Sequence, residues 1–330
     1  MRALALRILG SLLAALAIAG SAPLATAAQP TPDAPSDVAV ALALAPIHVQ
    51  ENGLVADFYR PPHAPGRLPA IVLLGGSEGG LNPGMAAFAQ LLAARGYAVL
   101  QLAYFGAPGL PDKLELVPLE YFGKAIDWLQ ARPDVDPNRI GLEGGSIGGE
   151  VALVVAAHDP RIKAVVAALP SSVVWPGIDP QNPNAPSTFT LAGKPLPDLP
   201  YGWTGSFKGV FALYADGLKA LDQHPDAIIP VERINGPVML VCGKSDGLWP
   251  SCPMSEQVAA RLKATGFAHP VQLHEYDDAG HFSFGPPVPE TNPFYAKLGG
   301  LGGSPAGNDA ARKDDWPRSL AFLDDALKAK

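Results

Sequence analysis

The stretch from Gly144 to Gly148 constrains this chain more than any other, because it reads G-x-S-x-G between two apolar runs. One run ends at Leu142 and the next begins at Val151, which predicts a strand that enters a sharp turn and a helix that leaves it. Glycine at both ends of the motif lets the chain fold back closely, since a side chain there would collide. Such a turn exposes the serine hydroxyl, so Ser146 is the predicted nucleophile.

The first 27 residues have the pattern of an export signal. Two arginines precede a short apolar run from Ile8 to Ala19, and Ala25-Thr26-Ala27 has the small-x-small form of a cleavage site. The run is too short for a comfortable membrane span. We therefore expect cleavage after Ala27, a secreted or periplasmic protein, and no stable membrane anchoring.

The rest of the chain has the composition of a globular protein. Of the 330 residues, 48% are hydrophobic and 17% are charged, and the formal net charge is −7. This charge, with no basic cluster, argues against nucleic acid or anionic lipid as a partner. Residues 28–46, rich in Ala, Pro, Asp and Ser, are a predicted linker, and residues 47–330 are a predicted single domain.

Apolar runs that predict strands alternate with segments of helical periodicity. An Asn-Gly pair at 52–53 first predicts a hairpin. Strands are then expected at 70–74, 97–104, 140–142, 162–169, 238–241 and 271–276, and helices at 85–95, 119–130, 151–157, 255–265 and 309–328. Alternation of this kind implies a mostly parallel central sheet with helices on both faces.

Residues from about 170 to 230 interrupt this alternation. Proline and glycine are concentrated between 176 and 205, aromatic residues are scattered around them, and only 208–222 reads as a helix. A long irregular insertion in a regular fold predicts a cap over the active site that forms much of an acyl pocket. Trp175 in this insertion is therefore a candidate substrate contact, although packing of the insertion onto the sheet remains the alternative. Trp249, in the loop after the strand at 238–241, is a second candidate substrate contact.

A second glycine-rich loop, Gly75 to Gly80, follows the first buried strand. It lacks the Lys-Ser/Thr of a phosphate loop and the spacing of a dinucleotide fingerprint, so no cofactor is expected. In a serine hydrolase this loop supplies one oxyanion-hole N–H, and the residue after the nucleophile, Ile147, supplies the other. We place the loop donor at Glu78, whose side chain is expected to be solvated or to cap a helix. Ser77 and Gly79 remain alternative donors and candidate substrate contacts.

Two further polar residues follow strands in the order expected of a catalytic triad. Asp246 comes just after the strand at 238–241, and His281 comes after the final strand. The order Ser146, Asp246, His281 is that of the α/β-hydrolase fold, in which all three lie at the carboxyl ends of parallel strands. The histidine would take the serine proton and the aspartate would orient the imidazole. This chemistry requires no metal, and the His and Asp spacing shows no ligand cluster.

Other candidates are weaker. Asp277 and Asp278 are too close to His281 in sequence to approach its ring easily, and Glu150 is expected to pack or form hydrogen bonds near the start of the helix. The remaining histidines lie before strands, inside a strand, in helices or in the cap and are expected to be solvated or satisfied: His48, His63, His158, His224, His269 and His274.

The chain contains two cysteines, Cys242 and Cys252. Export to an oxidising compartment would permit a disulfide between them. Spacing alone cannot supply the geometry, so a disulfide and two separate thiols both remain open.

With these residues in view, the chain resembles the C-terminal catalytic domain of the bile acid-CoA:amino acid N-acyltransferase and acyl-CoA thioester hydrolase family over residues 47–330. The segments that carry the resemblance are Pro69 to Gly76, Leu119 to Phe122, the serine motif with Gly149-Glu150, Pro230 to Ile234, Asp246 to Trp249, and Gly280-His281. The resemblance implies a serine, aspartate and histidine triad and hydrolysis of a small-molecule acyl thioester or ester. A carboxylesterase of dienelactone-hydrolase type, an amino acid N-acyltransferase and a non-catalytic binding protein are the alternatives, and the oligomeric state stays open.

Overall fold

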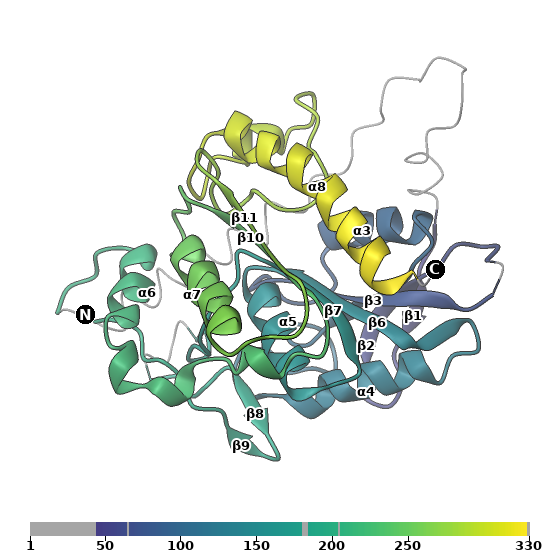
Figure 1. Ribbon diagram of the computed structural model, residues 1–330, viewed down its shortest axis with the longest axis horizontal. Coiled ribbons are helices and arrows are strands. Elements are labelled where there is room, and N and C mark those ends of the chain that lie inside the picture. Colours follow the sequence, from purple (N-terminus) through teal and green to yellow (C-terminus); the bar gives the residue numbers. More distant parts are fainter. Residues whose placement is uncertain (1–43, 65, 180–183, 204, 329–330) are drawn as a thin grey trace.

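The computed structural model describes residues 44–64, 66–179, 184–203 and 205–328. The predicted export signal and residues 28–43 of the predicted linker lie outside this range. An eight-stranded sheet runs through the molecule (Figure 1). Its strands, in spatial order, are β1 (Ile47–Val49), β2 (Val55–Tyr59), β4 (Ala98–Ala103), β3 (Leu68–Leu74), β6 (Val135–Gly145), β7 (Ile162–Ala168), β10 (Val238–Gly243) and β11 (Val271–Tyr276).

The sheet is mostly parallel, as the alternating pattern predicts. Strands β4, β3, β6, β7, β10 and β11 pair in parallel, whereas β1, β2 and β4 pair antiparallel at one edge. The predicted hairpin joins β1 to β2, and Asn52 and Gly53 both have positive φ, at 55° and 78°. Asparagine and glycine tolerate this left-handed conformation, which explains the Asn-Gly signal.

Helices cover both faces of the sheet (Figure 1). One face packs against α3 (Pro83–Ala94) and α8 (Pro305–Leu327), and the other against α4 (Leu119–Gln130), α5 (Ile147–His158) and α7 (Ser251–Ala264). Side chains of β3 alternate between the two resulting cores: Ile71 and Leu73 face α3 and α8, and Val72 and Leu74 face the opposite layer. This alternation makes the strand a continuous apolar run, because both of its faces are buried.

The predicted cap is an irregular excursion between β7 and β10. It contains α6 (Val210–Leu218), where a helix over 208–222 is predicted, and the short strands β8 (Phe189–Leu191) and β9 (Lys194–Pro195). These two strands form a second small sheet with β5 (Val117–Pro118), which directly precedes α4. The excursion is thereby tied to the body of the domain through a backbone ladder.

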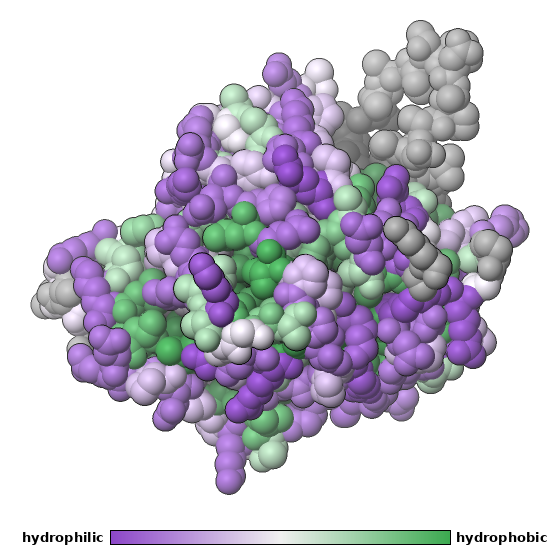
Figure 2. Space-filling model, viewed as in Figure 1, coloured by the Kyte–Doolittle hydropathy of each residue, from purple (hydrophilic) through white to green (hydrophobic). Residues whose placement is uncertain are grey.

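The outer surface is largely polar. Figure 2 shows hydrophilic residues over most of one face, with hydrophobic residues gathered near the middle of the view. Among the helices of the described residues, none has both the length and the apolar composition that a membrane span requires.

Candidate active site

The serine motif forms the predicted strand-turn-helix elbow. Ser146 lies between the last residue of β6 and the first residue of α5, with φ 60° and ψ −128°. This strained conformation is rare for a residue with a side chain and marks functional sites. Glycine is required on both sides, because a Cβ at Gly144 would lie 2.4 Å from the carbonyl oxygen of Gly148, and one at Gly148 would lie 2.3 Å from that of Leu74.

Three polar side chains from distant segments meet at this elbow. The Nε2 atom of His281 lies 2.8 Å from Oγ of Ser146, and its Nδ1 lies 2.8 Å from Oδ2 of Asp246. Asp246 follows β10 and His281 follows β11, so both stand at the carboxyl edge of the sheet. The backbone N–H of His281 donates to the carbonyl of Leu301, which fixes the histidine loop against the segment before α8. The structure therefore brings together the three residues that the sequence order selects.

The Asp246 carboxylate is held in one orientation. Its Oδ1 accepts the backbone N–H groups of Leu248 and Trp249, at 2.9 and 3.3 Å. Its Oδ2 accepts the Ser251 hydroxyl at 2.7 Å in addition to the histidine. Asp246 and His281 are both buried, so these contacts are shielded from water. Ser251 is not among the residues that the sequence predicts for the site, and its only signal is its place at the start of a helix, five residues after the aspartate.

Cys242 and Cys252 are joined by a disulfide, which answers the question that their spacing leaves open. Cys242 lies at the end of β10 and Cys252 in the first turn of α7. The bond closes the loop that carries Asp246 and Ser251. The aspartate is thus anchored covalently as well as by hydrogen bonds.

The predicted oxyanion donors lie around Ser146. Ile147 is the first residue of α5, and the first N–H groups of a helix have no intrahelical partner. Gly76 lies beside Ser146, since a Cβ built on this glycine would lie 3.5 Å from Cβ of Ser146. The same loop contains Ser77, Glu78 and Gly79. The ring of Phe105 packs on Gly79, where φ is +66° and a Cβ would lie 2.8 Å from the ring.

The Glu78 side chain differs from our expectation. It folds back along its own loop, and its Oε1 accepts the Gly76 backbone N–H at 3.1 Å. Its Oε2 lies 2.8 Å from the Cβ position of Gly76, the same point that faces Ser146. Burial raises the pKa of this carboxyl, against the lowering effects of its own backbone N–H, the Gly76 N–H and nearby His281. The half-buried carboxylate is therefore held by its own loop beside Ser146, rather than fully solvated or capping a helix.

Trp175 and Trp249, the two candidate substrate contacts, belong to a buried aromatic cluster. Each is only 1% exposed. Tyr214 packs edge-on against both, with ring centroids 4.9 and 5.3 Å apart, and Tyr201 stacks on Trp175 at 5.7 Å. Trp249 also packs edge-on against the His281 ring at 6.0 Å. Both indoles are therefore buried packing residues that support the histidine and the cap.

Glu150 lies one helical turn after the nucleophile and is fully buried. Its Oε1 accepts the Trp175 backbone N–H at 3.3 Å, whereas its Oε2 has no hydrogen-bond partner among the described residues. Burial raises the pKa of this carboxyl well above its usual value. The residue packs and forms a hydrogen bond near the start of α5, as the sequence predicts.

The alternative acids have other partners. Asp277 pairs with Lys244 at 2.9 Å, and Asp278 accepts hydrogen bonds from the backbone and hydroxyl of Ser304. The described residues contain one compact set of metal-type ligands, Cys242, Cys252 and Glu275. Its two sulfur atoms are consumed by the disulfide, so no thiolate is available to bind an ion.

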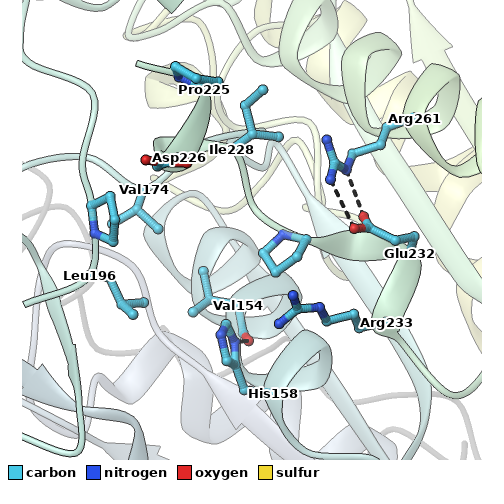
Figure 3. A pocket seen from close by; sticks show the side chains of 12 residues that line it. Val154, His158, Val174, Leu196, Pro225, Asp226, Ile228, Glu232, Arg233 and Arg261 are labelled. Carbon is cyan, nitrogen blue, oxygen red and sulfur yellow. Dashed lines mark hydrogen bonds and ion pairs between the residues drawn. The ribbon is translucent and has the colours of Figure 1, made fainter.

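A cavity of about 270 Å³ lies away from this site, between the end of α5, the cap and the 3₁₀ turn Val231–Arg233 (Figure 3). Its floor includes Val154, eight residues after Ser146 and so about 12 Å further along the helix. Arg261 closes one side through two hydrogen bonds to Glu232, at 2.6 and 2.9 Å. The cavity is thus separate from the triad.

Residues 117–329 match a family model described as BAAT / acyl-CoA thioester hydrolase C terminal. The chain belongs to this family. A second model, the X-Pro dipeptidyl-peptidase (S15) family, matches residues 51–179, which include the serine motif.

Curated members of the BAAT and acyl-CoA thioester hydrolase family align over most of the chain. Acyl-coenzyme A thioesterase 1 of Rattus norvegicus is 31% identical over 295 residues, covering 86% of this chain and 66% of the relative. Acyl-coenzyme A thioesterase 1 of Homo sapiens is 32% identical over 272 residues, covering 79% and 61%. The chain thus spans less than two thirds of the length of these relatives.

Solved structures confirm the fold. An acylaminoacyl peptidase of Pyrococcus horikoshii superposes with a TM-score of 0.54 at 16% identity, over 86% of this chain and 42% of the peptidase. A dienelactone hydrolase-like promiscuous phosphotriesterase from metagenomic libraries gives 0.52 at 18% identity, over 86% and 99%. The family member described here therefore has the predicted α/β-hydrolase fold.

Proposed function

We propose that this protein is an exported serine hydrolase that cleaves acyl thioesters or esters through an acyl-enzyme, with acyl-CoA-type thioesters as the leading substrate class. The observation that carries the proposal is the chain of two 2.8 Å contacts from Asp246 through His281 to Ser146, at the tip of a strained elbow. A bystander serine would not require that backbone conformation, a buried histidine and a buried carboxylate together.

Each residue has a distinct task in this mechanism. His281 removes the hydroxyl proton as Ser146 attacks the acyl carbon, and it returns that proton to the leaving thiol or alcohol. Asp246 fixes the imidazole tautomer and stabilises its positive form. The N–H groups of Ile147 and of the Gly75–Gly80 loop are the proposed donors to the oxyanion, an effect worth about 3 kcal/mol per donor in a comparable hydrolase. Water then attacks the acyl-enzyme, with His281 again as the base.

Family membership supports the substrate class. The related proteins from rat and human carry the name acyl-coenzyme A thioesterase, and the family description pairs that activity with the BAAT acyltransferases. A thiol is a better leaving group than an alcohol, so protonation by His281 would suffice for its departure without a metal. Oxygen-ester cleavage of dienelactone-hydrolase type and acyl transfer to an amino acid remain the alternatives, since the same acyl-enzyme serves all three reactions.

A single set of assays separates these reactions. The purified protein is offered acyl-CoA thioesters and p-nitrophenyl esters of the same chain length, with and without glycine or taurine. The proposal predicts higher kcat/KM on the thioester and free acid as the product. Formation of an amide would instead indicate a transferase, and preference for the oxygen ester would indicate a carboxylesterase. Ser146→Ala serves as the control for background hydrolysis.

Export is the other part of the proposal. The export-signal pattern supports it, and so does the disulfide, because such bonds persist mainly in oxidising compartments. Expression of the full chain in a bacterium with a Sec pathway, followed by fractionation and N-terminal sequencing, tests it. We expect mature protein that begins at residue 28 outside the cytoplasm; full-length protein in the cytoplasm would contradict export.

A further inference from the structure

The loop N–H groups beside the nucleophile already have an acceptor. Gly76, which lies beside Ser146, donates its N–H to Oε1 of Glu78. A backbone N–H of the predicted oxyanion loop thus already serves a side chain of the protein.

The position of the second carboxylate oxygen strengthens this observation. The position that a Cβ would take on Gly76 is 2.8 Å from Oε2 of Glu78 and 3.5 Å from Cβ of Ser146. The carboxylate and the nucleophile therefore lie on the same side of Gly76. A carboxylate resembles an oxyanion in its charge and in its preference for several N–H donors, and charge-assisted bonds of this type are about twice as strong as neutral ones.

We propose that the Glu78 carboxylate occupies the oxyanion site of the substrate-free enzyme and must rotate away before a substrate carbonyl oxygen can accept the loop N–H groups. The inference rests on the proposed serine-hydrolase function and adds a gate to it. No covalent bond changes in this step. A side-chain rotation exchanges one acceptor for another on the same donors.

Two titratable groups face Glu78 and define how the gate responds to pH. His281 lies close enough to stabilise the negative carboxylate, and Tyr104, whose hydroxyl donates to the Gly75 carbonyl at 2.6 Å, lies beside the loop. A protonated Glu78 is a weaker acceptor than the carboxylate, so proton uptake loosens the gate. The gate therefore closes more tightly as the pH rises.

The test compares rates of fluorophosphonate labelling, because this reagent reacts at the nucleophile and develops negative charge on an oxygen that needs the same donors. Glu78→Ala and Glu78→Gln retain every backbone N–H. At pH 8 we expect the Ala variant to be labelled fastest, the Gln variant more slowly and the wild type most slowly. The rate constant of the Ala variant should exceed that of the wild type about tenfold, which is the equivalent of one charge-assisted hydrogen bond. The gain should shrink as the pH falls toward 5.

Control variants distinguish an error in the gate proposal from an error in the proposed serine-hydrolase function. Glu290→Gln removes an exposed carboxylate and should leave the rate unchanged. Thermal unfolding checks that each variant is folded, and the near-isosteric Gln variant decides the outcome if the Ala variant is unstable. Equal labelling of wild type and Ser146→Ala would overturn the proposed function itself. If the wild type is labelled at Ser146 but the Glu78 variants are labelled no faster than the wild type at pH 8, the gate alone would be overturned.

Discussion

The disulfide between Cys242 and Cys252 encloses the loop that carries Asp246. Cys242 is the penultimate residue of β10 and Cys252 lies in the first turn of α7, so the bond joins the two elements that flank the proposed catalytic acid. Within the enclosed loop, Ser251 donates to the carboxylate oxygen that also contacts His281. The covalent bond and the hydrogen bonds therefore fix the same side chain.

Replacing both cysteines by serine should lower both stability and turnover. The cross-link spans 10 residues, and loop-closure entropy for that length gives a loss of about 3 kcal/mol in the free energy of unfolding. Turnover should fall as well, because Asp246 loses part of its anchoring. Urea titrations and kcat measurements check both effects. Wild type treated with a reductant should behave like the double variant; a reduced enzyme with unchanged kcat would show that hydrogen bonds alone position the acid.

Ser251→Ala should slow the reaction without changing substrate binding. It removes the hydrogen bond of the Ser251 hydroxyl to Asp246 and leaves the backbone bond of Ser251 to Trp249 in place, and a bond to a charged group is worth about 1.5–3 kcal/mol. We expect kcat to fall by roughly tenfold or more and KM to stay the same. Ser255→Ala is the matched control, since Ser255 is equally buried in the same helix but its hydroxyl has no partner among the described residues. Equal effects of the two substitutions would contradict the positioning role.

Stability should decrease as the pH rises from about 4.5 to 8 because of Glu143. This residue is fully buried in β6, and neither carboxylate oxygen has a hydrogen-bond partner among the described residues. Burial, with Asp315 nearby, raises the pKa of Glu143 to about 8 from its ordinary 4.5. Burial likewise raises the pKa of Asp315 to about 7. Between about pH 4.5 and 8 the folded protein retains protons that the unfolded chain has released, so raising the pH favours unfolding.

Glu143→Gln tests this effect. The substitution should leave the midpoint of thermal unfolding nearly unchanged at pH 5, where the carboxyl of the folded protein is already neutral. At pH 8 it should raise the midpoint, because no proton need be lost. An identical pH profile for the variant and the wild type would show that Glu143 is not the group responsible.

Gly148→Ala should prevent the elbow from forming. The new Cβ would lie 2.3 Å from the carbonyl oxygen of Leu74, a backbone atom that cannot yield without moving β3. We expect little folded protein and no labelling of Ser146. Gly123→Ala is the control. Gly123 lies within helix α4, and a Cβ there would meet only the Arg161 side chain, at 3.8 Å. This substitution should stabilise the helix by up to about 1 kcal/mol. Normal folding and labelling of the Gly148 variant would contradict the steric argument.

The sequence predicts the parts of the site that depend on local patterns and chain order. The elbow follows from glycines flanking Ser146, and Asp246 and His281 follow from their places after consecutive parallel strands. The details that depend on side-chain packing are not predicted. The return of the Glu78 carboxylate to its own loop, the burial of Trp175 and the bond from Ser251 all require distances that sequence spacing does not contain.

The bounds of the strands and helices also differ in how well local sequence patterns predict them. Asp136-Pro137-Asn138, a sequence typical of a turn, lies inside β6, where the register with β3 shifts between Leu68 and Ala70. A proline can be accommodated at such an irregularity because the ladder is already interrupted there. Helix α4, by contrast, spans Leu119–Gln130, the range that its apolar periodicity predicts.

Peptide mapping of an acid-quenched reaction tests the central claim most directly. The wild-type protein is mixed with an acyl-CoA thioester for a few milliseconds to seconds, quenched, digested and analysed by mass spectrometry. The account predicts an acyl group on Oγ of Ser146 that is absent from the Ser146→Ala variant. Turnover with no adduct on this peptide, or an adduct on another residue such as Ser171, would contradict it.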